Sequence, residues 1–143
     1  MISENKSLFR PVAVPDVKIS GFWGKWQDAV CDETAAILLD RCEKAGMIQA
    51  IDVDQESPGV VIPIDEKWTG STQMFWDSDL GKSIETIAYS LYRKPNPALE
   101  ARADAIIDMY EKLQQEDGYL NAWFQRVQPG RRWLNLRDHH ELY

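Results

Sequence analysis

The 143-residue sequence has few cationic residues, and no cationic cluster longer than Arg131 and Arg132. Its 16 Lys and Arg against 23 Asp and Glu give a formal net charge of −7. Nucleic acids and anionic membranes are bound through clustered cations, so the sequence predicts neither a nucleic-acid nor a membrane partner. It also lacks the run of about 20 apolar residues that a membrane-spanning helix needs. Residues 1–10 lack the apolar segment of a secretory signal, which makes the cytoplasm the simplest location.

Cysteine is scarce as well, with only Cys31 and Cys42. In one intact helix, eleven residues at about 1.5 Å of rise would put them roughly 16 Å apart. A disulfide needs Cα atoms within about 7 Å, so we expect two free thiols, buried as ordinary core residues. The sequence has no cysteine pair with zinc-site spacing, and no G-x-G-x-x-G, Walker A or G-x-S-x-G pattern. Dinucleotide, ATP and serine-esterase functions therefore lack support.

The sequence is otherwise that of one ordinary domain, 44% hydrophobic and 27% charged. Apolar residues that recur at three- and four-residue steps predict helices over residues 22–45 and 75–93. A third helix is predicted from Pro97 past Leu113, with Asn96 as its N-cap. The predicted buried stripes are Trp23, Trp26, Val30, Ile37, Leu38, Cys42 and Ala45; Leu80, Ile84, Ile87, Ala88 and Leu91; and Leu99, Ala103, Ile106, Tyr110 and Leu113.

The segments outside the predicted helices are expected to connect them. Two prolines in residues 11–20 indicate an edge strand or an extended arm, so residues 1–21 are assigned to an N-terminal arm. Residues 49–70 look irregular, with a possible short strand at 60–62. Gly46, Asp117–Gly118 and Pro129–Gly130 predict stops and turns, and residues 135–143 could open a fourth helix. Long amphipathic helices in series predict an all-α layered fold.

The first candidate site is the start of the second helix, residues 75–79. At 100° per residue, Asp77 lies in line with Ile84 and Ala88, at the N-terminal mouth of the apolar stripe. Its carboxylate would face the interior of the bundle, stabilised by the helix dipole. A plainer interpretation stays open, in which Asp77 is a helix cap and Asp79 is an acid of the first turn.

The second candidate site is the end of the chain, where the two histidines, His139 and His140, stand beside Glu141. Histidine can titrate near neutral pH, bind a metal or hydrogen-bond a sugar hydroxyl. His140 and Glu141 also begin the zinc-protease pattern H-E-x-x-H, but the sequence stops before the second histidine of that pattern. A solvent-exposed polar helix start is the alternative.

Aromatic side chains are the third feature, because six tryptophans in 143 residues is a high number. Flat aromatic faces can pack against sugars while polar groups reach the hydroxyls. Trp23 and Trp26 share one helical face and are predicted to be core, whereas Trp76, next to Asp77, is the best candidate for a pocket wall. Trp68, Trp123 and Trp133 remain undecided between these roles.

Three segments together carry a family resemblance: Phe-Trp-Asp-Ser-Asp at 75–79, Gln-Gln-Glu-Asp-Gly-Tyr-Leu-Asn at 114–121 and Asn-Leu-Arg-Asp-His-His-Glu-Leu-Tyr at 135–143. In this order and at about this spacing they resemble the β-L-arabinofuranosidases of glycoside hydrolase family 127. Val-Lys-Ile-Ser-Gly-Phe-Trp at 17–23 resembles the start of that family's first helix. The resemblance extends from about residue 11 to the last residue.

The resemblance implies that residues 22–143 are the N-terminal part of an (α/α)6 barrel followed by β-sandwich domains. It implies an exo-acting, retaining glycosidase that releases L-arabinofuranose from β-L-arabinofuranosides, with an arabinofuranoside-type oligosaccharide as substrate. The family's nucleophilic cysteine, held in a zinc site with further cysteines and a glutamate, and its acid/base glutamate would lie beyond residue 143. Zinc is therefore expected for the full-length enzyme, while Cys31 and Cys42 match none of its ligands, so no catalytic or metal residue is expected in this chain.

For this chain the resemblance implies substrate-binding residues instead. His140 matches a histidine of the family's sugar pocket, and Glu141, Trp76, Asp77 and Asp79 fall on the pocket side. Twelve barrel helices need roughly 300 residues or more, and the chain supplies three and the start of a fourth. We therefore expect it to expose a large apolar patch, and to self-associate or to pack against the remainder of the protein.

Two other classes of function remain open from the sequence. One is a different helical-barrel enzyme, such as a polysaccharide lyase or an unsaturated-uronide hydrolase, with Asp77 and Asp79 as acid and base. Residues two apart on a helix do not face each other, which counts against that pair. The other is a non-catalytic helical module that binds carbohydrate or another protein.

Overall fold

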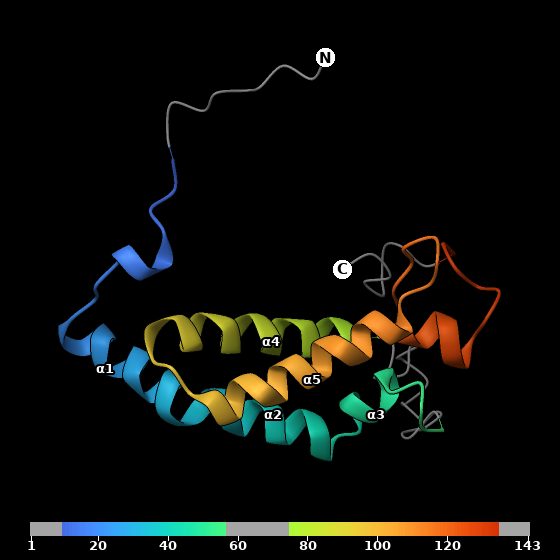
Figure 1. Ribbon diagram of the computed structural model, residues 1–143, viewed down its shortest axis with the longest axis horizontal. Coiled ribbons are helices and arrows are strands. Elements are labelled where there is room, and N and C mark those ends of the chain that lie inside the picture. The colour runs from blue at the N-terminus through green and yellow to red at the C-terminus, as the bar shows by residue number, and fades with distance from the viewer. Residues whose placement is uncertain (1–9, 57–74, 135–143) are drawn as a thin grey trace, which may run out of the picture.

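The computed structural model describes residues 10–56 and 75–134, and in these residues the chain is helical, with no β-strand. This confirms the prediction of an all-α chain. Figure 1 shows α4 and α5 running side by side along the length of the molecule, and α2 and α3 pack against α4. The elements are η1 (Val14–Asp16), α1 (Gly21–Ala29), η2 (Val30–Thr34), α2 (Ala35–Lys44), α3 (Met47–Ile51), α4 (Trp76–Arg93), α5 (Pro97–Leu113) and η4 (Trp123–Val127).

The first predicted helix is one continuous helical run, α1–η2–α2, whose bounds differ from the predicted 22–45 by one residue at each end. Its middle, η2, is a π-helical turn. The run ends at Lys44, and Gly46 follows two residues later with a left-handed φ of 86° that favours glycine. The chain then forms the short helix α3, so the prediction of irregular structure from residue 49 is wrong for residues 49–51. The strand considered at residues 60–62 lies outside the described residues.

The helix α4 begins one residue after its predicted start and ends at its predicted last residue. The helix α5 begins at Pro97 as predicted but ends at Leu113, short of its predicted end beyond that residue. The Asn96 side chain accepts a hydrogen bond from the Leu99 N–H (3.1 Å), and Pro97 occupies the first helical position, as the sequence predicts. Pro95 follows shortly after the last residue of α4. The predicted turns at Asp117–Gly118 and Pro129–Gly130 are also confirmed, since Gly118 and Gly130 have φ values of 85° and 87°.

The helix α4 is the centre of the packing, because it contacts α2, α3 and α5. Most of the predicted stripe of α5 is buried, and Tyr110 is partly buried. In the predicted stripe of α4, Leu80 and Ile87 are fully buried. Ala88 is exposed, contrary to the prediction. The main core cluster consists of Ala35, Leu39, Cys42, Ile51, Leu80, Ile87, Leu99, Ala103, Ile106, Leu113 and Ala122.

The predicted stripe of the first helix is largely wrong. Trp23 and Trp26 are 68% and 59% exposed, and Ile37 and Ala45 are exposed too. The buried positions are Ala35, Leu39 and Cys42. The wider π-helical turn η2 shifts the angular phase between α1 and α2, and none of the described elements covers the aromatic face of α1.

The N-terminal arm is described from residue 10 onward and is exposed up to α1. It forms no strand there; a single 3₁₀ turn, η1, interrupts an extended course. The arm approaches α1 at Gly24, where an added Cβ would lie 2.8 Å from the Ile19 carbonyl oxygen. The helix α1 begins at Gly21, the last residue assigned to the arm.

Ion pairs between helices lie on the surface. Arg93 contacts Asp28 (2.9 Å) and Lys94 contacts Asp32, which joins the end of α4 to α1 and η2. Arg102 contacts Asp40 (2.8 Å), which joins α5 to α2. Water and salt screen such exposed pairs, so they contribute little to stability, and the buried apolar face of α4 dominates the packing energy.

Both cysteines are free thiols, as predicted, although only Cys42 is buried and Cys31 is half-buried. The Cys42 Sγ lies 3.5 Å from the Ser83 Oγ, across the α2–α4 contact. Within residues 10–56 and 75–134, no helix has the length and apolar content to cross a membrane.

The junction at Gly46 predicts a stability difference between two glycine substitutions. Gly46→Ala forces an L-residue into left-handed backbone beside the Trp76 ring and should cost about 1–2 kcal/mol. Gly81→Ala is the matched control within α4, where an added Cβ meets nothing within 4 Å. It should stabilise the chain by about 0.5–1 kcal/mol. Urea unfolding followed by circular dichroism measures both, and equal stability of the two variants would contradict the assigned turn.

Candidate functional site

The candidate site is built around the N-terminal end of α4, where Phe75 is the N-cap residue and Trp76 the first helical residue. Trp76 is buried, at 5% exposure, and its ring lies against Gly46 at the α2–α3 junction. The structure therefore uses the Trp76 ring to fill space between helices. The prediction that Trp76 contacts a sugar stays a prediction, with the ring surrounded by the protein's own atoms.

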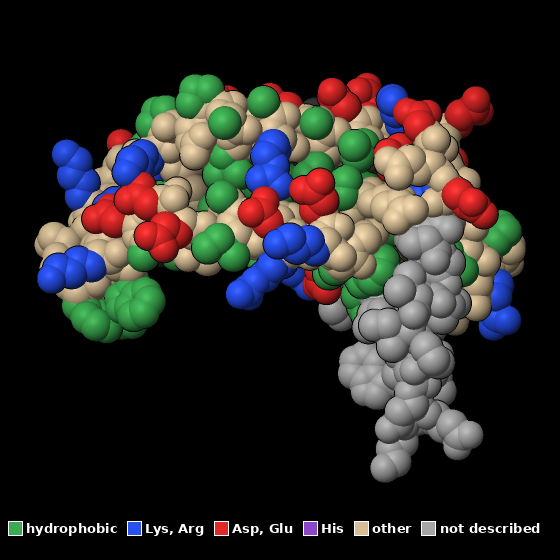
Figure 2. Space-filling view, turned by 90° about the horizontal axis from the view of Figure 1, so that it is seen from below, with side chains coloured by type: hydrophobic (Ala, Val, Ile, Leu, Met, Phe, Trp, Pro, Cys, Tyr) green, Lys and Arg blue, Asp and Glu red, His purple; other side chains and the backbone are tan. Residues whose placement is uncertain are grey.

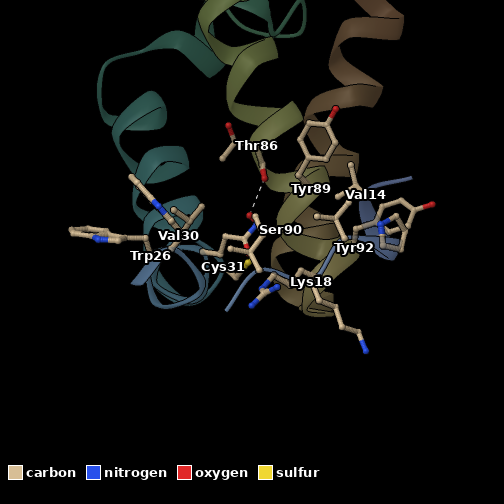
Figure 3. A pocket seen from close by; sticks show the side chains of 15 residues that line it. Val14, Lys18, Trp26, Val30, Cys31, Thr86, Tyr89, Ser90 and Tyr92 are labelled. Carbon is tan, nitrogen blue, oxygen red and sulfur yellow. Dashed lines mark hydrogen bonds between the residues drawn. The ribbon is translucent and has the colours of Figure 1, made fainter. Parts of the chain in front are cut away.

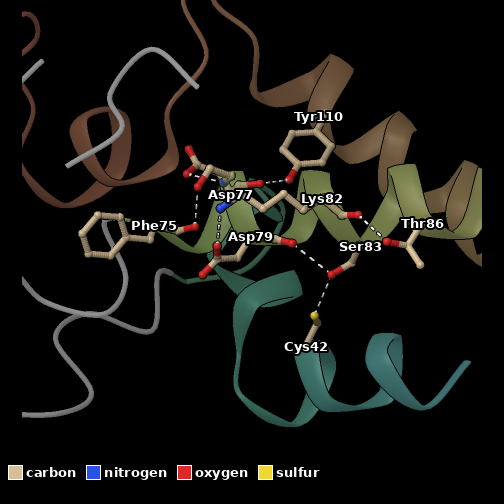
Figure 4. A network of polar contacts seen from close by, with 9 residues as sticks. Cys42, Phe75, Asp77, Asp79, Lys82, Ser83, Thr86 and Tyr110 are labelled. Carbon is tan, nitrogen blue, oxygen red and sulfur yellow. Dashed lines mark hydrogen bonds and ion pairs between the residues drawn. The ribbon is translucent and has the colours of Figure 1, made fainter. Parts of the chain in front are cut away.

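Asp77 is the second residue of α4, and it is buried as the helical phase predicted. Its Oδ2 accepts a hydrogen bond from the Ala122 N–H (2.8 Å), and its Oδ1 accepts one from the Ser78 N–H (2.9 Å). Its carbonyl oxygen accepts a hydrogen bond from the Tyr110 hydroxyl (2.5 Å). Asp77 therefore joins α4 to α5 and to the segment that leads into η4, and it is not the N-cap of its helix (Figure 4).

The electrostatics of this junction are dominated by desolvation. Burial raises the pKa of Asp77 above 3.8, and the backbone N–H groups of Ala122 and Ser78 oppose that shift by stabilising the carboxylate. Burial also raises the pKa of Tyr110, with the neighbouring Asp77 charge acting in the same direction. Tyr110 therefore remains a neutral hydrogen-bond donor.

Asp79 faces a different environment. Its carboxylate pairs with Lys82 (2.9 Å) and its side chain is 45% exposed. Its carbonyl oxygen accepts a hydrogen bond from Ser83 Oγ, which in turn contacts Cys42 (Figure 4). Asp77 and Asp79 thus bind separate partners, which gives no support to the alternative in which they form an acid/base pair.

The segment after α5 forms a second cluster, whose aromatic and basic composition the sequence showed without revealing its packing. Tyr119, Trp123 and Phe124 are buried together, with Phe75 packed against them. The Arg132 guanidinium lies 3.8 Å from the centre of the Tyr119 ring. A cation over an aromatic face stabilises such an arrangement by about 0.5–2 kcal/mol, so this cluster forms a wall next to the start of α4.

Polar groups fix the ends of this segment. The Arg132 side chain also pairs with Asp117 (2.7 Å). The Asn121 Oδ1 accepts from the Phe124 N–H (3.1 Å) and so caps η4, with Asn121 itself fully buried. Arg126 donates to the Ala50 carbonyl oxygen at the end of α3. These contacts hold the Ala122 N–H against Asp77.

The remaining predicted substrate-binding residues, His140 and Glu141, lie outside the described residues. Of the five predictions, the structure therefore brings Trp76 and Asp77 together at one buried junction and leaves Asp79 beside Lys82. Among residues 10–56 and 75–134, no group of three or more His, Cys, Asp or Glu side chains could hold a metal ion. The described residues thus do not fit a zinc site.

The model of the β-L-arabinofuranosidase catalytic domain of glycoside hydrolase family 127 matches residues 16–143. The chain belongs to this family.

A curated relative agrees with the family match. The non-reducing end β-L-arabinofuranosidase of Bifidobacterium longum subsp. longum is 34% identical over 85 residues, which cover 56% of this chain. The same stretch is 12% of the relative, so the chain spans only a small part of that protein. No solved structure matches the chain, and the (α/α)6 barrel stays a prediction.

The Asp77 junction predicts that the stability difference between wild type and an Asp77 variant depends on pH. Because its folded-state pKa is raised, the folded state keeps a proton that the unfolded chain loses near pH 3.8. Stability from this group is therefore greatest below pH 3.8 and falls as the pH rises through the raised pKa. Asp77→Asn keeps the shape but turns an NH₂ toward a backbone N–H, at a cost of about 1–3 kcal/mol. The variant's deficit relative to wild type should shrink as the pH rises.

Urea unfolding at several pH values between 3 and 7 tests this. Asp79→Asn, on the same turn, is the control, because it removes the same charge from a half-exposed side chain and should change stability by about 0.5 kcal/mol or less. Parallel stability profiles for wild type and Asp77→Asn would show that the buried carboxylate does not titrate in this way.

Proposed function

We propose that this chain forms the N-terminal part of the catalytic domain of a retaining glycosidase. The reaction is release of L-arabinofuranose from the non-reducing end of β-L-arabinofuranosides. The family match over residues 16–143 is the observation that carries the proposal. The β-L-arabinofuranosidase activity of the Bifidobacterium relative supports the substrate class.

In this proposal the described residues act as a scaffold. Asp77 and Trp76 set the position of the α4 end, since their contacts are with Ala122 and Gly46. Asp79 keeps a half-exposed carboxylate that can accept a hydrogen bond from a sugar hydroxyl. His140 and Glu141 supply the other polar contacts to the sugar.

The catalytic nucleophile, the acid/base residue and the zinc ligands belong, in this proposal, to polypeptide beyond residue 143. Zinc comes from the family resemblance, and the described part of the chain offers no cluster for it. In this proposal the chain supplies the elements that support the sugar site from behind. These are the buried N-terminal end of α4, the aromatic cluster around Tyr119 and the turn at Gly118.

The proposal predicts a clear division of activity. The protein encoded by the full reading frame should release L-arabinose from a synthetic aryl β-L-arabinofuranoside, and residues 1–143 alone should not, because one part of the site cannot orient the sugar for reaction. Arabinose release is followed by chromatography, with the aryl α-L-arabinofuranoside as stereochemical control. Hydrolysis by neither protein, or equal hydrolysis of both anomers, would overturn the proposal.

A further inference from the structure

Exposed aromatic side chains occur at two ends of the molecule. At the end where α1 lies, Phe22 packs edge-on against Trp23 and Trp26, and all three are more than half exposed. Figure 2 shows hydrophobic side chains protruding at that end. Beside them the arm, α1, η2 and α4 form an open groove of about 790 Å³ with a mainly apolar lining (Figure 3). This agrees with the apolar patch expected from the sequence and places it on α1.

The groove beside α1 is a poor site for a sugar. Thr86 and Ser90 line it, and each donates its hydroxyl proton to a backbone carbonyl oxygen of its own helix. Aliphatic side chains of the arm line another side, and they cannot satisfy the hydroxyls that a buried sugar presents. A contact with the substrate is therefore better sought at the other end of the molecule.

At that other end, the Trp133 side chain is half-exposed. Its ring stands edge-on to the buried Tyr119 ring, with centroids 4.9 Å apart. Tyr119 belongs to the aromatic cluster against which Phe75, the N-cap residue of α4, packs. Figure 1 shows the segment after α5 at the end of the molecule where α4 begins. Trp133 and Asp79 therefore lie at the same end of the molecule.

The backbone of Trp133 is strained. Its φ is 66°, in the left-handed region, and no other non-glycine residue in the described ranges has a positive φ. A bulky side chain rarely adopts this conformation, because its Cβ comes too close to a backbone carbonyl oxygen. Contacts with Tyr119 and with the Arg132 guanidinium, 5.4 Å from the ring centre, hold the indole in place. Strain of this kind is concentrated where side chains bind ligands, which motivates a functional role for this ring.

A polar network borders the Trp133 ring. The Arg132 guanidinium donates hydrogen bonds to the Gln115 Oε1 (2.8 Å) and to the Asp117 Oδ2 (2.7 Å). Gln115 and Asp117 are both exposed, so their remaining acceptor positions face water. A flat aromatic face beside groups that can bind hydroxyls is what sugar-binding surfaces combine. The surface around Trp133 therefore offers both kinds of group that a sugar needs.

We infer that Trp133 binds the leaving-group side of the substrate, namely the sugar to which the released arabinose is attached. This inference rests on the proposed function. An enzyme that removes a terminal sugar encloses that sugar, so the rest of the substrate extends toward the surface. Trp133 is half-exposed on a buried support, which suits this outer position, and its rigid ring binds a sugar face at a low cost in conformational entropy. Trp133 thereby favours glycosides in which a second sugar follows the terminal arabinose.

The first experiment compares two substrates with the protein of the full reading frame. One is a β-linked arabinofuranosyl disaccharide, and the other is methyl β-L-arabinofuranoside, whose methyl group offers no ring to stack on. Trp133→Leu removes the flat face and should lower kcat/KM for the disaccharide roughly tenfold. It should hardly change kcat/KM for the methyl glycoside. Equal losses for the two substrates, or no loss for either, overturn the inference.

Two further variants separate this contact from a structural role. Trp133→Tyr keeps a flat ring at the same positive φ as Trp133→Leu, so it should restore most of the preference for the disaccharide. Leu134→Ala, at the exposed neighbouring position, is the control and should leave both substrates unaffected. If Trp133→Tyr loses the preference as fully as Trp133→Leu while both keep the wild-type melting temperature, the flat ring is not what selects the substrate.

A second experiment needs no catalysis and no variant. Hydroxyl-radical footprinting of the unaltered protein is carried out with a thio-linked analogue of the disaccharide, which resists hydrolysis, and with L-arabinose. The analogue should slow oxidation of Trp133 several-fold, and L-arabinose should not. Trp123 is buried already and serves as the internal control. Oxidation of Trp133 that the analogue does not change overturns the inference, as does slow oxidation without any sugar, which means that another part of the protein covers the ring.

The proposed function is judged separately, by arabinose release from the aryl β-L-arabinofuranoside. A protein that releases arabinose but leaves Trp133 unprotected keeps the proposed function and loses this inference. An inactive protein whose Trp133 is protected by the analogue loses the proposed function and keeps the sugar contact. An inactive protein with unprotected Trp133 loses both.

Discussion

The hydrogen bond between the Asp77 carboxylate and the Ala122 N–H is the constraint on which the rest of this site depends. It joins residues 45 positions apart, in an environment where an unpaired carboxylate would be costly. Tyr110 adds a second connection from α5 to the same turn of α4. Three separate elements thus meet at one buried acid, and the aromatic cluster around Tyr119 takes its position from that meeting point.

A helix is predicted well from the sequence when its ends have local signals, such as a capping side chain or a proline. Asn96 and Pro97 define the start of α5 through a side-chain cap and a fixed φ, which depend on few neighbours. The exposure of Trp23 and Trp26 could not be predicted, because periodicity identifies an apolar face but not the element that covers it. The π-helical turn η2 adds a change of phase that a constant 100° per residue does not capture.

The candidate site shows the same division. The inward direction of Asp77 follows from its spacing to Ile84, and the structure confirms its burial. Its partner could not be found in this way, because a backbone N–H has no sequence signature. The pairing of Asp79 with Lys82 is a local i, i+3 contact that was open to prediction.

Two of the three segments that carry the family resemblance meet in space at this junction. Asp77 belongs to the first, and Ala122 directly follows Asn121, the last residue of the second. Gly118 and Asn121 supply a turn and a cap, which are backbone functions. The residues of these two segments that carry the resemblance therefore have structural roles at this junction. Enzymes that differ in substrate can share such a scaffold. In the proposed function, substrate choice has to come from groups that face the sugar, and among the described candidates only Asp79 keeps a half-exposed carboxylate.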